Sequence, residues 1–427
     1  MNLGWFSIVR LGAIQMAIGA IVVLMTSTLN RLMIVELALP AILPGFLVAL
    51  HYGIQITRPN WGFRSDAGGR RTPWVINGMA ILGAGAFMAA LAIPALEINL
   101  KFGLLISVIA YALIGLGVGA SGTSLLALLA TLTAPRRRAA AATITWLMMI
   151  AGIAITAGVT GAMLDPYSHT LLLKIVGSVV LIAFVLTVIS IFGIEKRPSE
   201  IKETETMSFA EGIKEIWAEP SARHFSIFVF LSMTAYFMQE LILEPYAGLV
   251  FGFSPGASTS LSGAQNGGVF LGMISVGALC TGLNLGSLRF WVVAGCLGSA
   301  LSLTVIAGLG LGGTATQLSI AVVSLGFFNG MFAVGAIGSM MSLAGEGRSD
   351  REGTRVGIWG AAQAIAAGFG GLLGASMVDV LRISLTADAA AYGTVFLFEA
   401  ALFIASSTLA LRIMSTRPIS VGLVPGE

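Results

Sequence analysis

The sequence predicts an all-α membrane protein with twelve transmembrane helices in two halves of six. Of its 427 residues, 56% are hydrophobic and only 10% are charged, and the mean hydropathy is +0.93. A soluble domain carries roughly a quarter charged residues. Apolar runs of about 20 residues recur along the whole chain, and each can cross a bilayer. Because backbone polar groups in lipid must be satisfied internally, and these runs are too long for barrel strands, we expect helices.

The order of the apolar runs gives the expected domain organisation. Twelve spans are predicted at residues 11–37, 41–57, 74–94, 102–132, 140–163, 171–193, 224–251, 263–285, 289–310, 315–343, 354–378 and 391–413. Six lie in an N-terminal half, 1–194, and six in a C-terminal half, 224–427. A highly charged linker, 195–223, joins the halves. Its segment SFAEGIKEIWAEP resembles a capped amphipathic helix on the inner membrane surface, and a plain spacer is the alternative.

Arginine is distributed unevenly among the short loops. The loops after predicted spans 2, 4 and 10 carry Arg58, Arg64, Arg70 and Arg71, then Arg136, Arg137 and Arg138, then Arg348, Arg351 and Arg355. The intervening loops carry only Lys101, Lys174 and Arg382. Because positively charged loops stay on the cytoplasmic side, we expect the even-numbered loops and both termini to be cytoplasmic.

The motifs of common enzyme and metal sites are missing from the sequence. Cys280 and Cys296 lie in apolar runs without metal-ligand spacing. We find no nucleophile elbow and no phosphate-binding loop in a strand–turn–helix context. We therefore expect the protein not to be an enzyme and to hold no metal of its own. The formal net charge of +3 gives no reason to expect a nucleic-acid partner.

A weak internal repeat relates the two halves. Arg138 precedes Trp146 by eight residues, as Arg351 precedes Trp359, and Asp165 and Asp379 follow at comparable distances. Parallel six-helix repeats of this kind occur in transporter folds.

The loop between predicted spans 2 and 3 carries a specific spacing. It reads RPNWGFRSDAGGRRTPW, with Gly62-x3-Asp66-x2-Gly69-Arg70-Arg71. This spacing resembles the cytoplasmic loop between helices 2 and 3 of major facilitator superfamily proteins, where the loop holds the cytoplasmic ends of the halves together. The resemblance implies a major facilitator fold. It also implies a conformational latch of Gly62, Asp66, Gly69, Arg70 and Arg71 that meets the start of span 11 near Arg355.

A second resemblance is carried by STLNRLMIVELALPAILPG, residues 27–45, and by HYGIQITRPNWGFRSDAGGRRTPW after it. Together they resemble the bacteriochlorophyll-delivery branch of the superfamily, the PucC and LhaA-type proteins of phototrophic bacteria. The resemblance implies a pigment carrier that binds bacteriochlorophyll, with carotenoid as a further cargo, and delivers it to light-harvesting antenna polypeptides. It also implies contacts with pigment synthase and membrane insertion machinery, and a location in the bacterial cytoplasmic or intracytoplasmic photosynthetic membrane.

Several polar residues within the spans are candidates for pigment or substrate binding. His51 is the only histidine well inside a span, and its imidazole could be an axial ligand to pigment magnesium; a structural histidine is the alternative. Asn30, Arg31 and Glu36 belong to the second resemblance and are predicted to form a polar centre between the halves. Arg31 and Glu36 are five residues apart and should point in different directions from one α-helix. A structural ion-pair network is the alternative.

Further ionisable groups lie within the predicted spans: Glu240, Glu244 and Glu399. Such groups are costly in a bilayer and often functional. Glu240 and Glu399 are further candidates for pigment or substrate binding. Under a second hypothesis, a proton-coupled transporter of a small solute, Glu36, Glu240 and Glu399 would be proton sites. A third hypothesis is a scaffold for assembly that transports nothing. The first hypothesis, the pigment carrier, rests on the TLNRLMIVEL resemblance.

Overall fold

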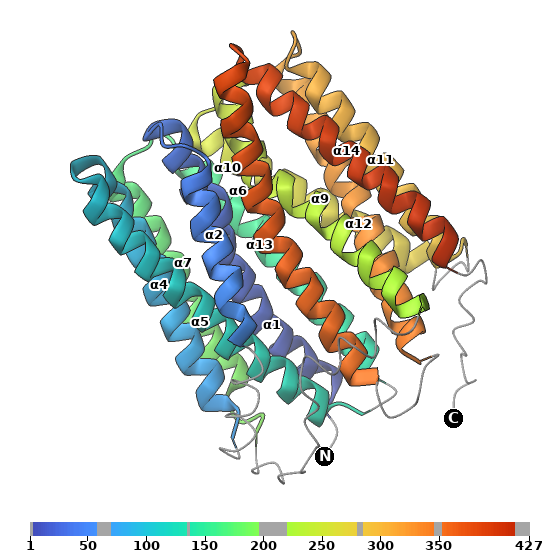
Figure 1. Ribbon diagram of the computed structural model, residues 1–427. Coiled ribbons are helices and arrows are strands. Elements are labelled where there is room, and N and C mark those ends of the chain that lie inside the picture. The colour runs from blue at the N-terminus through green and yellow to red at the C-terminus, as the bar shows by residue number, and fades with distance from the viewer. Residues whose placement is uncertain are drawn as a thin grey trace.

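The computed structural model describes residues 3–57, 70–134, 137–195, 220–279, 285–345 and 352–414. Within these ranges the chain forms long helices that run up and down through one bundle (Figure 1). The helices are α1 (Trp5–Val23), α2 (Ile42–Ile54), α4 (Thr72–Ile98), α5 (Leu100–Leu132), α6 (Arg138–Met163), α7 (His169–Ile191), α9 (Pro220–Phe251), α10 (Pro255–Gly277), α11 (Leu288–Leu309), α12 (Ala315–Gly345), α13 (Glu352–Ser384) and α14 (Asp388–Ile413).

The helix boundaries follow local signals in the sequence. Asn99, Ser168, Ser254 and Ser287 each precede a helix, and each side chain accepts a hydrogen bond from the backbone amide three residues later. Such N-caps satisfy amides that have no partner within the helix. Ten helices in the described part of the chain are long and apolar enough to cross a membrane, and the shorter apolar stretch Ile42–Thr57 completes the second crossing.

The predicted spans agree with the observed helices to within a few residues at most positions, with one clear error. The eighth span was expected at 263–285, whereas α10 runs from Pro255 to Gly277. The first turns of α10, PGASTSLS, contain few apolar side chains. In the structure its small residues Gly256, Ser258, Thr259 and Gly263 are buried against other helices. Packing against protein rather than lipid removes the need for apolar side chains there.

Most of the buried apolar side chains gather in two large clusters. One cluster is built from α1, α2, α4, α5, α6 and α7, and the other from α9 to α14. The two halves touch mainly where α6 packs on α10 and where α2 packs on α13, and Figure 1 shows α2 lying beside α13. The predicted amphipathic linker helix falls at 196–219, and Gly62, Asp66 and Gly69 of the predicted latch fall at 58–69. Both segments lie outside the described residues.

The helix bundle has two ends, which we call proximal and distal. The proximal end is where α1 begins and α14 ends. The distal end is the opposite one, where α1 passes to α2, α6 to α7, α9 to α10 and α13 to α14.

Candidate functional site

The first span does not remain an α-helix over its whole length. After Val23 it continues as two π-helical segments, Leu24–Leu29 and Leu32–Glu36. The Leu37 amide donates to the Leu32 carbonyl, five residues back, at 3.0 Å. Segments of π-helix are rare and are frequent at functional sites. They coincide here with the TLNRLMIVEL stretch that carries the pigment-carrier resemblance.

The π-helical geometry corrects one prediction. Arg31 and Glu36 were expected to point in different directions, but the Arg31 guanidinium forms an ion pair with the Glu36 carboxylate. Because hydrogen bonds in a π-helix span five residues, side chains five apart come onto one face. Arg31 is fully buried and Glu36 is partly exposed. The first span therefore carries a cation together with its own counter-ion.

The same segment makes several polar contacts with the opposite half. Ser27 donates to the Glu244 carboxylate of α9. The Asn30 amide donates to the Leu241 carbonyl at 2.7 Å, and the Arg31 Nη2 donates to the Phe253 carbonyl at 2.8 Å. On the α10 side, the hydroxyls of Thr28 and Thr259 lie 3.4 Å apart. We call this group the inter-half cluster; its members are Ser27, Thr28, Asn30, Arg31, Glu36, Glu244 and Thr259.

Three buried polar atoms of the inter-half cluster have no hydrogen-bond partner among the described residues. They are Asn30 Oδ1, Arg31 Nε and Glu244 Oε2. Buried polar atoms in native proteins are nearly always paired, because an unpaired one costs about 1–3 kcal/mol. All three lie between the halves, where a bound group with both donors and acceptors could pair with them.

Other predicted site residues lie apart from the inter-half cluster. His51 is buried in α2, and its Nε2 is 2.8 Å from the Gln55 amide nitrogen, one turn further along. Glu399 is fully buried in α14, which packs on α11 and α9, and neither carboxylate oxygen has a partner in the described part of the chain. Glu240 lies on α9 one turn before Glu244, where Thr26 of the first span is its hydrogen-bonding neighbour.

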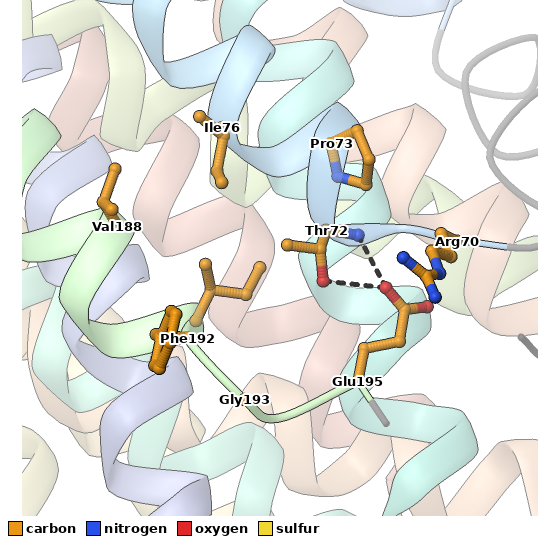
Figure 2. A pocket seen from close by; sticks show the side chains of 9 residues that line it. Arg70, Thr72, Pro73, Ile76, Val188, Phe192, Gly193 and Glu195 are labelled. Carbon is orange, nitrogen blue, oxygen red and sulfur yellow. Dashed lines mark hydrogen bonds between the residues drawn. The ribbon is translucent and has the colours of Figure 1, made fainter. Parts of the chain in front are cut away.

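Two residues of the predicted latch are described, and they lie at the start of α4. The Glu195 carboxylate accepts from the backbone amides of Arg71 and Thr72 and from the Thr72 hydroxyl, at 2.7–3.0 Å. The Arg71 side chain donates to the Thr131 hydroxyl at 2.6 Å. Figure 2 shows Arg70 beside Glu195, at the mouth of a pocket of about 200 Å³. These contacts fix the end of α4 within the N-terminal half, and the latch partner near Arg355 remains a prediction.

Sequence reasoning passed over several members of the cluster. Ser27, Thr28 and Thr259 were absent from the predicted site; a hydroxyl in a helix often bonds to its own backbone, so its type alone does not indicate a contact with another helix. Glu244 was noted but not placed in the site. The sequence did contain one signal for Ser27. It lies close to Asn30 and Arg31, and together they form a polar run in an otherwise apolar span.

Comparison with known proteins gives the family and the fold. The family described as PUCC protein matches residues 28–417. The chain is 62% identical to the Bacteriochlorophyll synthase 44.5 kDa chain of Rhodobacter capsulatus, over 98% of this chain and 97% of that protein. It is 28% identical to Protein PucC of Cereibacter sphaeroides, over 92% and 88%.

The fold resembles solved transporter structures. A crystal structure of the peptide transporter POT in complex with alafosfalin matches with a TM-score of 0.70 and 16% identity over 97% of each chain. A POT family transporter with a thioalcohol-conjugated peptide matches with a TM-score of 0.70 and 13% identity over 96% of each chain. The prediction of a helical major facilitator fold is thereby confirmed.

One prediction is contradicted by these comparisons. The protein was expected not to be an enzyme, because no catalytic motif of a soluble enzyme was found. The relative with 62% identity over nearly the whole chain bears the name of a bacteriochlorophyll synthase chain. An enzyme made of membrane helices need not carry the soluble motifs that were searched for, so their absence was no argument against an enzymatic role.

Proposed function

Because the chain belongs to the PUCC protein family, we propose that it binds bacteriochlorophyll at the inter-half cluster and passes it to light-harvesting antenna polypeptides. The protein is a multi-pass membrane protein related to photosynthetic pigment. The name of the 62% identical relative supports a role of this protein close to the step that makes the pigment. In this proposal the chain receives newly made pigment as part of a synthase assembly in the bacterial inner membrane and releases it to the antenna.

The observation that carries the proposal is the set of unpaired polar atoms in the inter-half cluster. Bacteriochlorophyll is large and apolar, with carbonyl groups that accept hydrogen bonds and a magnesium that takes an axial ligand. Arg31 Nε would donate to a carbonyl, and Asn30 Oδ1 or Glu244 Oε2 would supply an oxygen, the ligand type that magnesium prefers. Both halves contribute, so a relative movement of the halves would make or break the site.

His51 remains a second candidate for the magnesium ligand. Its Nε2 is engaged with Gln55, so ligation through that nitrogen would require Gln55 to turn away. A cluster-based site requires no such rearrangement. The same experiment separates the two assignments.

The test is an absorption spectrum of the gently solubilised, tag-purified protein from a phototrophic host. We expect a near-infrared bacteriochlorophyll band at fixed stoichiometry. Glu244→Gln keeps the shape of the side chain but removes its charge, and we expect pigment retention to fall, because a neutral amide oxygen is a weaker magnesium ligand than a carboxylate oxygen. Glu399→Gln is the matched control, because it makes the same change at a buried glutamate outside the cluster.

Each outcome decides between assignments. Pigment lost in Glu244→Gln but kept in Glu399→Gln supports the cluster. Pigment lost only in His51→Ala moves the site to α2. A colourless wild-type protein from pigmented membranes refutes pigment binding and favours the solute transporter, which proton-dependent uptake assays would then examine.

A further inference from the structure

Two aspartates at the distal end connect the halves in the same way. Asp379, near the end of α13, accepts hydrogen bonds from the backbone amides of Ala41 and Ile42 at 3.0 and 2.7 Å, where α2 begins. Asp165, just after α6, accepts from the Gly256 amide at 3.0 Å and from the Ser254 hydroxyl, where α10 begins. Each carboxylate thus caps the first turn of a helix in the opposite half.

The two contacts occupy equivalent positions in the internal repeat. Asp165 and Asp379 are separated by the same number of residues as their capped partners Ile42 and Gly256, since 379 − 165 equals 256 − 42. The N-terminal half therefore caps the C-terminal half, and the C-terminal half caps the N-terminal half. An adventitious surface contact would not be expected to repeat at both symmetry-related places.

The helices behind each cap are in close contact. A Cβ built on Gly256 would lie 2.5 Å from both the Asp165 carboxylate and the Gly161 carbonyl oxygen, so only glycine lets the carboxylate approach. At the other contact, a Cβ built on Gly45 of α2 would lie 2.9 Å from the Ala375 Cβ of α13. The backbones of the two halves thus meet directly beneath each aspartate, and the distal end cannot open without separating both pairs.

The energetics favour closure while both caps are made. The first amides of a helix have no partner within the helix, and a carboxylate there is also favoured by the helix dipole. Hydrogen bonds to a charged acceptor are stronger than neutral ones. Nearby, burial and the Glu97 charge raise the pKa of Tyr167 to about 12, so this phenol adds no charge beside Asp165. The Arg382–Asp388 ion pair at this end stays within the C-terminal half.

We propose that Asp165 and Asp379 are paired inter-half caps that hold the distal end closed, and that the distal end opens only when both caps are released. The proposal concerns the movement of the halves and does not depend on what the protein carries.

The experiment measures the separation of the halves at the distal end by electron–electron double resonance in lipid nanodiscs. Spin labels are placed at Ile98 and Leu311, two highly exposed residues at the distal end of opposite halves, in the full chain with Cys280→Ser and Cys296→Ala. The variants are Asp165→Ala, Asp379→Ala and the double variant. Asp388→Ala is the matched control, because it removes a distal aspartate whose ion pair stays within the C-terminal half.

We expect a longer-distance population that grows by about fivefold with one cap removed, and by about twenty-five-fold with both, if each cap contributes independently as a typical N-cap does. The control should keep the wild-type distribution. Identical distributions in the wild type and the double variant would overturn the proposal, as would an equal shift in Asp388→Ala. If the double alanine variant does not accumulate, Asp165→Asn and Asp379→Asn are measured beside the single alanine variants. The asparagine variants keep one acceptor and should shift the distribution less than alanine does. The single alanine variants then decide: a shift in both supports the caps, and no shift in either refutes them.

Discussion

The contact between α6 and α10 allows a sharp test of how the halves are packed. A Cβ built on Gly161 would lie 2.6 Å from the Gly256 carbonyl oxygen and closer still to the Ser260 backbone nitrogen. Gly158, one turn earlier on α6, has nothing within 4 Å of its Cβ position. Gly161→Ala and Gly158→Ala therefore make the same chemical change on one helix. Only Gly161→Ala creates a steric conflict with the opposite half.

The magnitude follows from the geometry. Carbon and oxygen atoms need about 3.4 Å or more, so α6 and α10 must separate by about 1 Å to admit the Gly161→Ala methyl. Both substitutions gain about 1 kcal/mol of helix propensity, and this gain cancels in the comparison. Overpacking costs about 1–3 kcal/mol. Gly161→Ala should therefore be less stable than Gly158→Ala by that amount.

The assay is thermal unfolding of both variants in detergent, followed by tryptophan fluorescence. We expect the Gly161→Ala midpoint to lie about 2–6 °C below that of Gly158→Ala. The spin-label pair at Ile98 and Leu311 should also report a larger distal separation in Gly161→Ala alone. Equal midpoints and equal distances would show that the halves are not packed backbone to backbone at Gly161, and the closed distal end would have to be abandoned.

Two further predictions use matched side chains. The buried Tyr246 hydroxyl donates to the Ile306 carbonyl at 2.8 Å, so Tyr246→Phe should destabilise the fold by about 1–2 kcal/mol. The Tyr392 hydroxyl has no partner in the described chain. Tyr392→Phe should therefore be neutral or stabilising in the same unfolding assay. Glu195→Gln should lower the unfolding midpoint, because it weakens a carboxylate that accepts from two backbone amides and a hydroxyl at the start of α4; a midpoint equal to wild type would show that the cap is replaced by water at no cost.

Most helices were predictable because a helix that faces lipid must be apolar over about 20 residues. The predicted boundaries of α5, 102–132, and of α12, 315–343, differ from the observed ones by two residues or fewer. The error at α10 has a physical cause, because its polar side face packs on protein. Hydropathy detects helices that contact lipid, and it misplaces the bounds of a helix whose surface is covered by other helices.

The candidate site was predictable only in part. The polar run around Asn30 and Arg31 was recognisable as unusual, and the structure brings both residues to contacts with the opposite half. The pairing of Arg31 with Glu36 could not be foreseen, because the α-helical period was assumed and the segment is π-helical. Glu244 could not be ranked above Glu240 and Glu399, since all three are acids in apolar spans and only the fold shows which one meets Ser27.

The ion pair within the first span has a consequence for biogenesis. During synthesis this segment enters the membrane before α9 and α10 exist, so the Leu241 and Phe253 carbonyls cannot yet receive Asn30 and Arg31. An arginine opposes insertion by about 2.5–3.5 kcal/mol at a helix centre, and by less at Arg31, which lies five residues before the end of the first span. Glu36 is made five residues after Arg31, and the π-helical turn brings the two together without help from any later helix. The first segment can thus enter the bilayer with its charge already neutralised, and it makes its contacts with the second half after that half is synthesised.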